Sequence, residues 1–141
     1  MEKFEVKISY KKWDDEKGKD VRINESYVIE AVNYTDAEVI TNRIIKDNAL
    51  SDVKIKSMKS VVYDDIFTSL DYKAEDGNKW YRVKILLVVD EGKKVKNLIL
   101  VREKSITDSL ALLEEKMKGI VADWDSVAVT ETDIYEVVKN V

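Results

Sequence analysis

The 141-residue sequence contains no cysteine and no histidine. Without cysteine, the chain cannot form disulfides, thiolate metal sites or a cysteine nucleophile. Without histidine, it lacks the usual general base and the commonest transition-metal ligand. Its four glycines form no glycine-rich phosphate loop, and no nucleophile elbow or metal-ligand motif occurs. These absences predict a protein that is not an enzyme and that holds neither a metal nor a cofactor.

Long hydrophobic runs are also missing. No apolar run approaches the roughly 20 residues that a membrane-spanning helix needs, and residues 1–5 are charged and alternating, unlike a signal peptide. We therefore expect a cytoplasmic protein of a bacterium or of a phage-infected cell, without a membrane partner. The net charge of −4 is not that of a basic nucleic-acid-binding domain, so a nucleic-acid site would need a local cationic patch.

The sequence contains one structural unit twice, and internal repeats of this kind decide the fold. Each copy has a charged, glycine-containing turn between two alternating segments, which is typical of a β-hairpin. The other matching segments, in chain order, are residues 4–8 with 81–85, 34–37 with 106–109, and 61–64 with 133–136. Three such matches beside the turns, all in the same order, indicate a duplication.

Residue periodicity predicts the elements of each unit. Alternation with period two predicts strands, and apolar positions three to four residues apart predict helices. The first unit should have strands at 3–13, 20–32 and 53–67, the last one bent, and a helix at 35–47. The second should have strands at 79–90, 94–103 and 125–138 and a helix at 106–118. Thr35 and Glu38 form a predicted capping box, and the apolar helix stripes are Ala37, Ile40 and Ile44, and Leu110, Leu113 and Met117.

The predicted fold class is α+β, with two tandem ββαβ repeats. Repeat one covers residues 3–67, a polar linker covers 68–78, and repeat two covers 79–138. A unit of three strands and one helix is too small to bury much apolar surface alone. We therefore expect the repeats to pack about a pseudo-twofold axis into one domain spanning residues 1–141.

Residues that differ between the repeats are the better candidates for function, because shared residues serve the scaffold. One difference is a lysine row, Lys54, Lys56 and Lys59, which has no counterpart in repeat two. With Lys11 and Trp13 of the first hairpin, these lysines could form a cationic face with an aromatic platform. The alternative interpretation is a solvated strand whose lysines discourage edge pairing, with Trp13 capping the edge of the core.

A second difference is apolar. Where the first strand has Ser9 and Lys11, the equivalent strand has Leu86 and Val88, and its neighbour adds Leu98 and Leu100. Strands that are apolar on both faces are covered on both faces. The cover would be the other repeat or a second copy of the chain, so these four residues form a predicted interaction face.

Several of these segments also resemble a known family. They are the Phe-x-Val-Lys-Ile-x-Tyr start at 4–10, Tyr-Thr-Asp-Ala-Glu at 34–38, the segment 58–67 and Trp-Tyr-x-Val-Lys at 80–84. Together they resemble a family of Bacteroidetes and their phages, domain of unknown function 4494, over nearly the whole chain. The resemblance implies a small phage or bacterial cytoplasmic protein, and it transfers no functional residues.

The sequence thus predicts a non-catalytic binding protein. The favoured ligand is single-stranded nucleic acid, because lysines beside aromatic side chains suit backbone tracking combined with base stacking. The alternative is a protein–protein interaction or virion-assembly component that uses the apolar interaction face, with a homo-oligomer as one form of that interaction. The acidic balance of the chain favours that alternative.

Overall fold

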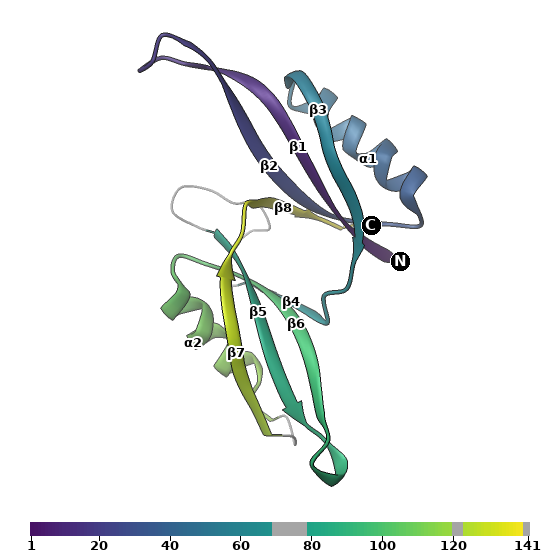
Figure 1. Ribbon diagram of the computed structural model, residues 1–141, viewed down its shortest axis with the longest axis vertical. Helices are drawn as coiled ribbons and strands as arrows, with labels where there is room; N and C mark the ends of the chain where they lie inside the picture. The colour runs from purple at the N-terminus through teal and green to yellow at the C-terminus, as the bar shows by residue number, and fades with distance from the viewer. Residues whose placement is uncertain (69–78, 120–122, 140–141) are drawn as a thin grey trace. The chain divides into compact units, whose positions relative to one another are not determined.

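We describe residues 1–68, 79–119 and 123–139 of a computed structural model of the chain (Figure 1). The chain divides into two compact units. Unit 1 contains Met1–Val61 together with the residues from Ile134 onward, and unit 2 contains Val62–Asp133. Each unit has a mixed four-stranded sheet and one α-helix, so the predicted α+β class is confirmed.

Unit 1 has the strand order β3-β1-β2-β8. Strand β1 is antiparallel to β2 and to β3, and β8 is parallel to β2. Alternate residues of β1, namely Phe4, Val6 and Ile8, are fully buried, and Ile40 and Ile44 of the helix pack against the same core. The elements are β1 (Glu2–Asp14), β2 (Lys19–Ala31), α1 (Tyr34–Asp47), β3 (Ser51–Val61) and β8 (Ile134–Val138).

Unit 2 has the order β4-β6-β5-β7, with β5 antiparallel to β6 and β7, and β4 parallel to β6. Its core joins Val83 and Ile85 of β5 to Leu112, Leu113 and Met117. The elements are β4 (Asp65–Thr68), β5 (Lys79–Val88), the 3-10 turn η1 (Asp90–Gly92), β6 (Lys94–Glu103), α2 (Ile106–Lys116) and β7 (Asp123–Glu131).

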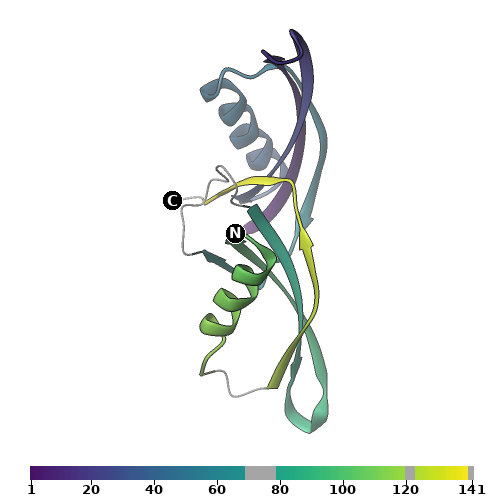
Figure 2. The same cartoon turned by 90° about the vertical axis from the view of Figure 1, so that its left-hand side faces the viewer.

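The predicted ββαβ repeats are present as β1-β2-α1-β3 and β5-β6-α2-β7. In each unit the helix lies along one face of its own sheet (Figure 2). Val6 and Val83 occupy matching places, because both are fully buried in the cores that these helices help to form. The helices also correspond at an offset of 72, since Ala37 and Ser109 are buried one turn before Thr41 and Leu113.

The prediction of one long third strand in each repeat was wrong. The first of these strands ends at Val61, and after a break the chain resumes as β4, which pairs with β6 in unit 2. The second ends at Glu131, and the chain then forms β8, which pairs with β2 in unit 1. The last short strand of each repeat therefore completes the sheet of the other unit. The pseudo-twofold axis and the single domain stay predictions.

A pair of hydrogen bonds explains where the first exchanged strand begins. Asp64 donates its backbone N–H to the carbonyl of Leu98 at 2.8 Å, and its Oδ2 accepts from the Leu98 N–H at 2.7 Å. Tyr63, just before it, is buried. The two bonds hold Asp64 beside Leu98 of β6, so the chain enters the sheet of unit 2 here instead of continuing β3.

The predicted capping box was also wrong. The N-cap of α1 is Asn33, whose side chain accepts from the backbone N–H of Asp36 at 2.9 Å. Thr35 lies inside the helix, because the helix begins at Tyr34. The matching cap of α2 is Ser105, which accepts from the N–H of Asp108 at 3.1 Å. The stripe Ala37, Ile40 and Ile44 is confirmed. Of the second predicted stripe, Leu113 and Met117 are buried in the core as expected, whereas Leu110 is half-buried and Leu112 is buried beside them.

Candidate binding surfaces

The first candidate surface is the sheet face of unit 1 that points away from α1, called here the α1-distal face. Its β1 residues lie between those that face the α1 core. They include Lys7 and Lys11, which are exposed, and Ser9, which is buried. In the antiparallel register, Lys59 lies beside Glu5 and Lys54 beside Ser9. Because partner residues in such a ladder project to the same face, the structure brings Lys54, Lys59 and Lys11 together on this face.

Lys56 has a different position. The partners on β3 step from Ser57 to Ile55 as β1 advances from Lys7 to Ile8, so Lys56 is the extra residue of a β-bulge. Its side chain is exposed. The predicted row of three lysines is therefore two lysines on one face and a third at an irregularity between them.

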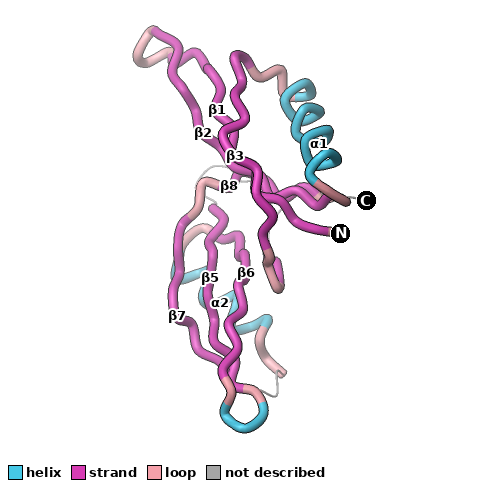
Figure 3. The backbone as a smooth tube through the Cα atoms, turned by 45° about the vertical axis from the view of Figure 1, so that its right-hand side comes forward, coloured by secondary structure: helices cyan, strands magenta, loops and turns pink. Residues whose placement is uncertain are grey.

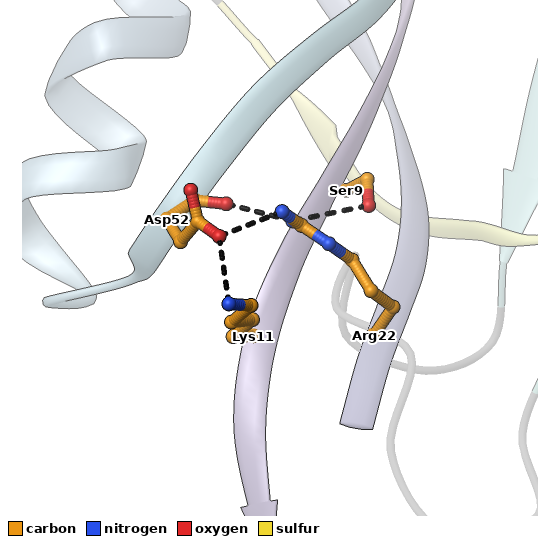
Figure 4. Close-up of polar contacts among 4 residues, drawn as sticks. All are labelled: Ser9, Lys11, Arg22 and Asp52. Carbon is orange, nitrogen blue, oxygen red and sulfur yellow. Dashed lines mark hydrogen bonds and ion pairs between the residues drawn. The ribbon is translucent and has the colours of Figure 1, made fainter. Parts of the chain in front are cut away.

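Carboxylates partly neutralise the α1-distal face (Figure 4). Asp52 lies 3.3 Å from Lys11 Nζ and 2.8 Å from Arg22 Nη2, both measured to its Oδ2. Arg22 also donates through Nη1 to the Asp52 carbonyl at 2.7 Å and to Ser9 Oγ at 3.4 Å. The hydrogen bond from Lys11, followed by the charge of Arg22, holds the pKa of Asp52 below its usual value. Lys59 is likewise paired with Glu5 at 3.6 Å.

Trp13 lies in the part of the β1-β2 hairpin that extends past the start of β3 (Figure 3), because β3 begins at Ser51, opposite Lys11. Its side chain is 58% exposed, and its indole N–H donates to Asp15 Oδ1 at 2.9 Å. At about 3.4 Å per residue, the distance along β1 from Trp13 to the level of Lys59 is roughly 27 Å. Trp13 is thus near Lys11 but far from Lys59.

The second candidate surface is the face of the unit 2 sheet that points away from α2, called here the α2-distal face. The predicted apolar residues lie on it, and in the β5-β6 register each one is opposite a basic residue. Leu86, Val88 and Leu98 are half-buried, and Leu100 is fully buried within the chain. A partner molecule on this face could therefore contact Leu86, Val88 and Leu98 but not Leu100. The pairs are Arg82 with Leu100, Lys84 with Leu98, Leu86 with Lys96, and Val88 with Lys94.

Sequence reasoning missed a buried cation on the same face. Arg102 is 1% exposed, and its Nε and Nη1 atoms have no hydrogen-bond partner in the part of the chain that the structure describes. It lies opposite Trp80 on β5 and Thr68 on β4. The sequence could have shown its position, because Arg102 continues the two-residue alternation of Leu98 and Leu100 along β6 and so falls on the same face of the strand.

A polar group in the core of unit 1 was also missed. Glu25 accepts one hydrogen bond from the Tyr10 hydroxyl and another from the Tyr27 hydroxyl, the second at 3.0 Å. Burial raises the pKa of both phenols above their ordinary range, and the Glu25 carboxylate raises it further. The sequence could have shown this, because Glu25 lies two residues before the buried Tyr27 on β2 and so its carboxylate falls on the face that packs into the core. Because both carboxylate oxygens accept from a phenol, this group is satisfied internally.

Within residues 1–68, 79–119 and 123–139, no three acidic side chains are grouped so that they could hold a metal ion. None of the helices described is both long enough and apolar enough to span a membrane.

Comparison with known proteins places the chain in a family. The family model Domain of unknown function (DUF4494) matches residues 3–140. The match spans nearly the whole chain, so the chain belongs to this family and the resemblance found in the sequence is confirmed. Among curated proteins, none matches the sequence. The family description names no activity, and the function is therefore inferred from the two surfaces.

Proposed function

We propose that this member of the DUF4494 family is a non-catalytic binding protein whose ligand is single-stranded nucleic acid. The nucleic-acid strand would lie along the α1-distal face, with its backbone running parallel to β1. The observation that carries the proposal is the row of exposed lysines on this face, Lys54, Lys59 and Lys11, which leads toward the exposed ring of Trp13. Cationic side chains that follow a backbone, together with an aromatic ring for stacking, are the usual elements of a single-strand site.

The lysines on this face are accessible to the phosphates of a nucleic acid. Lys54 and Lys56 form no ion pair or hydrogen bond with any described residue, so a phosphate could approach them without breaking a pair. Lys11 and Lys59 do have carboxylate partners. The Lys11–Asp52 pair is half-exposed on both sides, whereas the Glu5 carboxylate that pairs with Lys59 is only 13% exposed. Exposed ion pairs contribute little to stability. A phosphate could therefore replace the carboxylate of Asp52 at Lys11 at small cost, and it could approach the exposed ammonium group of Lys59 from the solvent side.

The proposal is tested by fluorescence anisotropy of a labelled single-stranded oligonucleotide titrated at several salt concentrations. Lys54→Ala combined with Lys59→Ala should reduce the salt slope of binding by about 1.4, since each lost phosphate contact removes about 0.7. Trp13→Ala should instead weaken binding by about 1–3 kcal/mol and leave the slope unchanged.

A matched control removes two positive charges from the helix of the same unit. Arg43 and Lys46 are exposed residues of α1, which lies on the other face of the sheet. The double variant Arg43→Ala, Lys46→Ala should therefore bind like the wild type. Absence of wild-type binding at low salt would overturn the proposal, and an equal effect of the two double variants would reject this face as the site.

A second candidate is a protein-interaction role, as in a virion-assembly component. It is favoured by the half-buried Leu86, Val88 and Leu98 on the α2-distal face. This surface belongs to unit 2, and its residues are distinct from those proposed for the nucleic acid.

A further inference from the structure

The end of the α2-distal face nearest the β5-β6 turn has an ordered charge pattern. Two rows of residues cross three neighbouring strands, in the order β6, β5, β7. Each row has a lysine on β6, an apolar residue on β5 and an aspartate on β7. The rows are Lys94, Val88 and Asp123, and Lys96, Leu86 and Asp125.

The direction of these side chains follows from their neighbours. Leu87 and its partner Trp124 pack against the core that contains α2. Residues before and after them therefore project to the α2-distal face. Leu86 and Val88 are half-buried there, and the four charged side chains are exposed.

The opposite charges in a row do not neutralise one another. They lie two strands apart, a separation of about 9.6 Å between backbones. None of the four charged side chains forms an ion pair or a hydrogen bond with a described residue. The face thus carries an apolar line with cations on one side and anions on the other.

Such a pattern is complementary to itself in one orientation. When two copies face each other across a twofold axis that runs parallel to β5, the β7 side of one copy lies over the β6 side of the other. Each row then meets the same row of the other copy, with Lys94 opposite Asp123 and Lys96 opposite Asp125. An axis perpendicular to the strands would place lysine over lysine, which is repulsive. Isologous contacts across a twofold axis are the commonest kind in homo-oligomers.

We propose that the α2-distal face joins two copies of this chain in a face-to-face homodimer with its twofold axis parallel to β5. Leu86 and Val88 of each copy form the centre of the contact, and the two lysine–aspartate sets flank it. The occupant is a second copy, because the apolar line has opposite charges on its two sides. The inference goes beyond the proposed nucleic-acid function and does not depend on it.

Lys84 limits the extent of this contact. It is the next residue of β5 on the same face, and it is exposed. On the twofold axis its ammonium group would meet that of the other copy, so it must extend toward solvent. The contact is therefore small, in the class below about 1,200 Å² that is typical of weak association. We expect a dimer that forms reversibly at high protein concentration.

Sedimentation equilibrium of the full chain over a range of concentrations, without nucleic acid, tests the proposal. The wild type should show a monomer–dimer equilibrium that weakens with salt. Reversing both cations (Lys94→Asp, Lys96→Asp) or both anions (Asp123→Lys, Asp125→Lys) should weaken dimerisation by about tenfold or more. Equimolar mixing of these two variants should restore association as a heterodimer, because every opposed pair is then complementary.

Two further variants make the test specific for this geometry. Lys84→Gln removes a like charge from the axis and should tighten the dimer about tenfold, whereas it would be neutral in an unrelated contact. The control Lys116→Asp, Lys118→Asp changes the same charge at the end of α2 and should leave association close to that of the wild type. Circular dichroism shows whether each variant is folded. A wild type that is monomeric throughout, or mixed variants that do not associate, would overturn the homodimer.

Discussion

The hydroxyl of Tyr27 donates a hydrogen bond to Oε2 of Glu25 at 3.0 Å, on the sheet face of unit 1 that contributes to the core with α1. Tyr10 donates to the other carboxylate oxygen. Both tyrosines are nearly buried, with exposures of 8% and 3% for Tyr10 and Tyr27. Because burial and the carboxylate both disfavour a phenolate, the pKa of each tyrosine is raised in the folded protein.

The raised pKa values predict a loss of stability in alkaline solution. An unfolded tyrosine releases its proton near pH 10, whereas the folded Tyr10 and Tyr27 retain theirs to higher pH. Their contribution is fully present below pH 10. Above it the unfolded state binds fewer protons than the folded state, so the free energy of unfolding falls by at most about 1.4 kcal/mol per pH unit for each tyrosine.

Urea unfolding between pH 8 and 11 measures this effect. The variant Tyr10→Phe, Tyr27→Phe should be less stable at pH 8, because Glu25 loses both donors, but its stability should fall less steeply above pH 10. Tyr34→Phe is the control for the loss of a hydroxyl away from Glu25, since Tyr34 is 53% exposed and its hydroxyl accepts from the Ser60 N–H at 3.3 Å. Equal slopes for the wild type and the double variant would contradict the prediction.

The buried guanidinium of Arg102 gives a second prediction. Two of its three nitrogens, Nε and Nη1, have no hydrogen-bond partner among the described residues. Replacing buried charges by apolar side chains of similar volume often stabilises a protein by about 1–4 kcal/mol. Arg102→Met should therefore raise the free energy of unfolding by about 1–3 kcal/mol in urea titrations. Arg82→Met is the comparison, because Arg82 Nε donates to the Tyr63 hydroxyl at 3.2 Å and its loss should destabilise. If Arg102→Met destabilises instead, the guanidinium has a partner.

The helix caps give a third prediction, which separates the predicted cap from the observed one. Asn33→Ala and Ser105→Ala each remove an acceptor for an N-terminal backbone N–H, and each should cost about 1 kcal/mol of stability. Thr35→Ala should change stability by less than about 0.5 kcal/mol, because a substitution away from such a feature usually has little effect. A larger loss at Thr35 than at Asn33 in urea unfolding would contradict the observed cap.

Much of the fold was predictable because its signals are local. The alternation of Phe4, Val6 and Ile8, repeated at Val83 and Ile85, identifies the strands and the faces that pack against a helix. Local alternation could not show that residues 65–68 leave their own sheet. That exchange depends on pairing with β6, about thirty positions away in the sequence, and a short strand has the same pattern whichever sheet it joins.

The candidate surfaces were predictable in part for the same reason. Strand phase places Lys11 and Lys54 on one face, and the register confirms this. The pairing of Lys11 with Asp52 was not predictable, because Asp52 adopts a positive φ of 49° at the start of β3 and belongs to a strand distant in sequence. Strand phase also could not show that Nε and Nη1 of Arg102 have no partner among the described residues, since phase gives the face of a residue but not its hydrogen-bond partners.

Asp52 offers the fourth prediction, which concerns the ligand. Asp52→Asn keeps the size of the side chain and tolerates the left-handed backbone conformation, which Asn adopts readily. It removes the negative charge shared by Lys11 and Arg22, so two cations on the α1-distal face become available to phosphates. Because the residue is exposed, urea unfolding should change little at neutral pH. Affinity for a single-stranded oligonucleotide should rise, and the salt slope should increase by up to about 0.7 for each released cation.

Glu38→Gln neutralises one exposed carboxylate on α1 and measures the effect of net charge alone. An equal gain in both variants would mean that Asp52 does not compete with the ligand, whereas a gain confined to Asp52→Asn places the phosphate backbone beside Lys11 and Arg22.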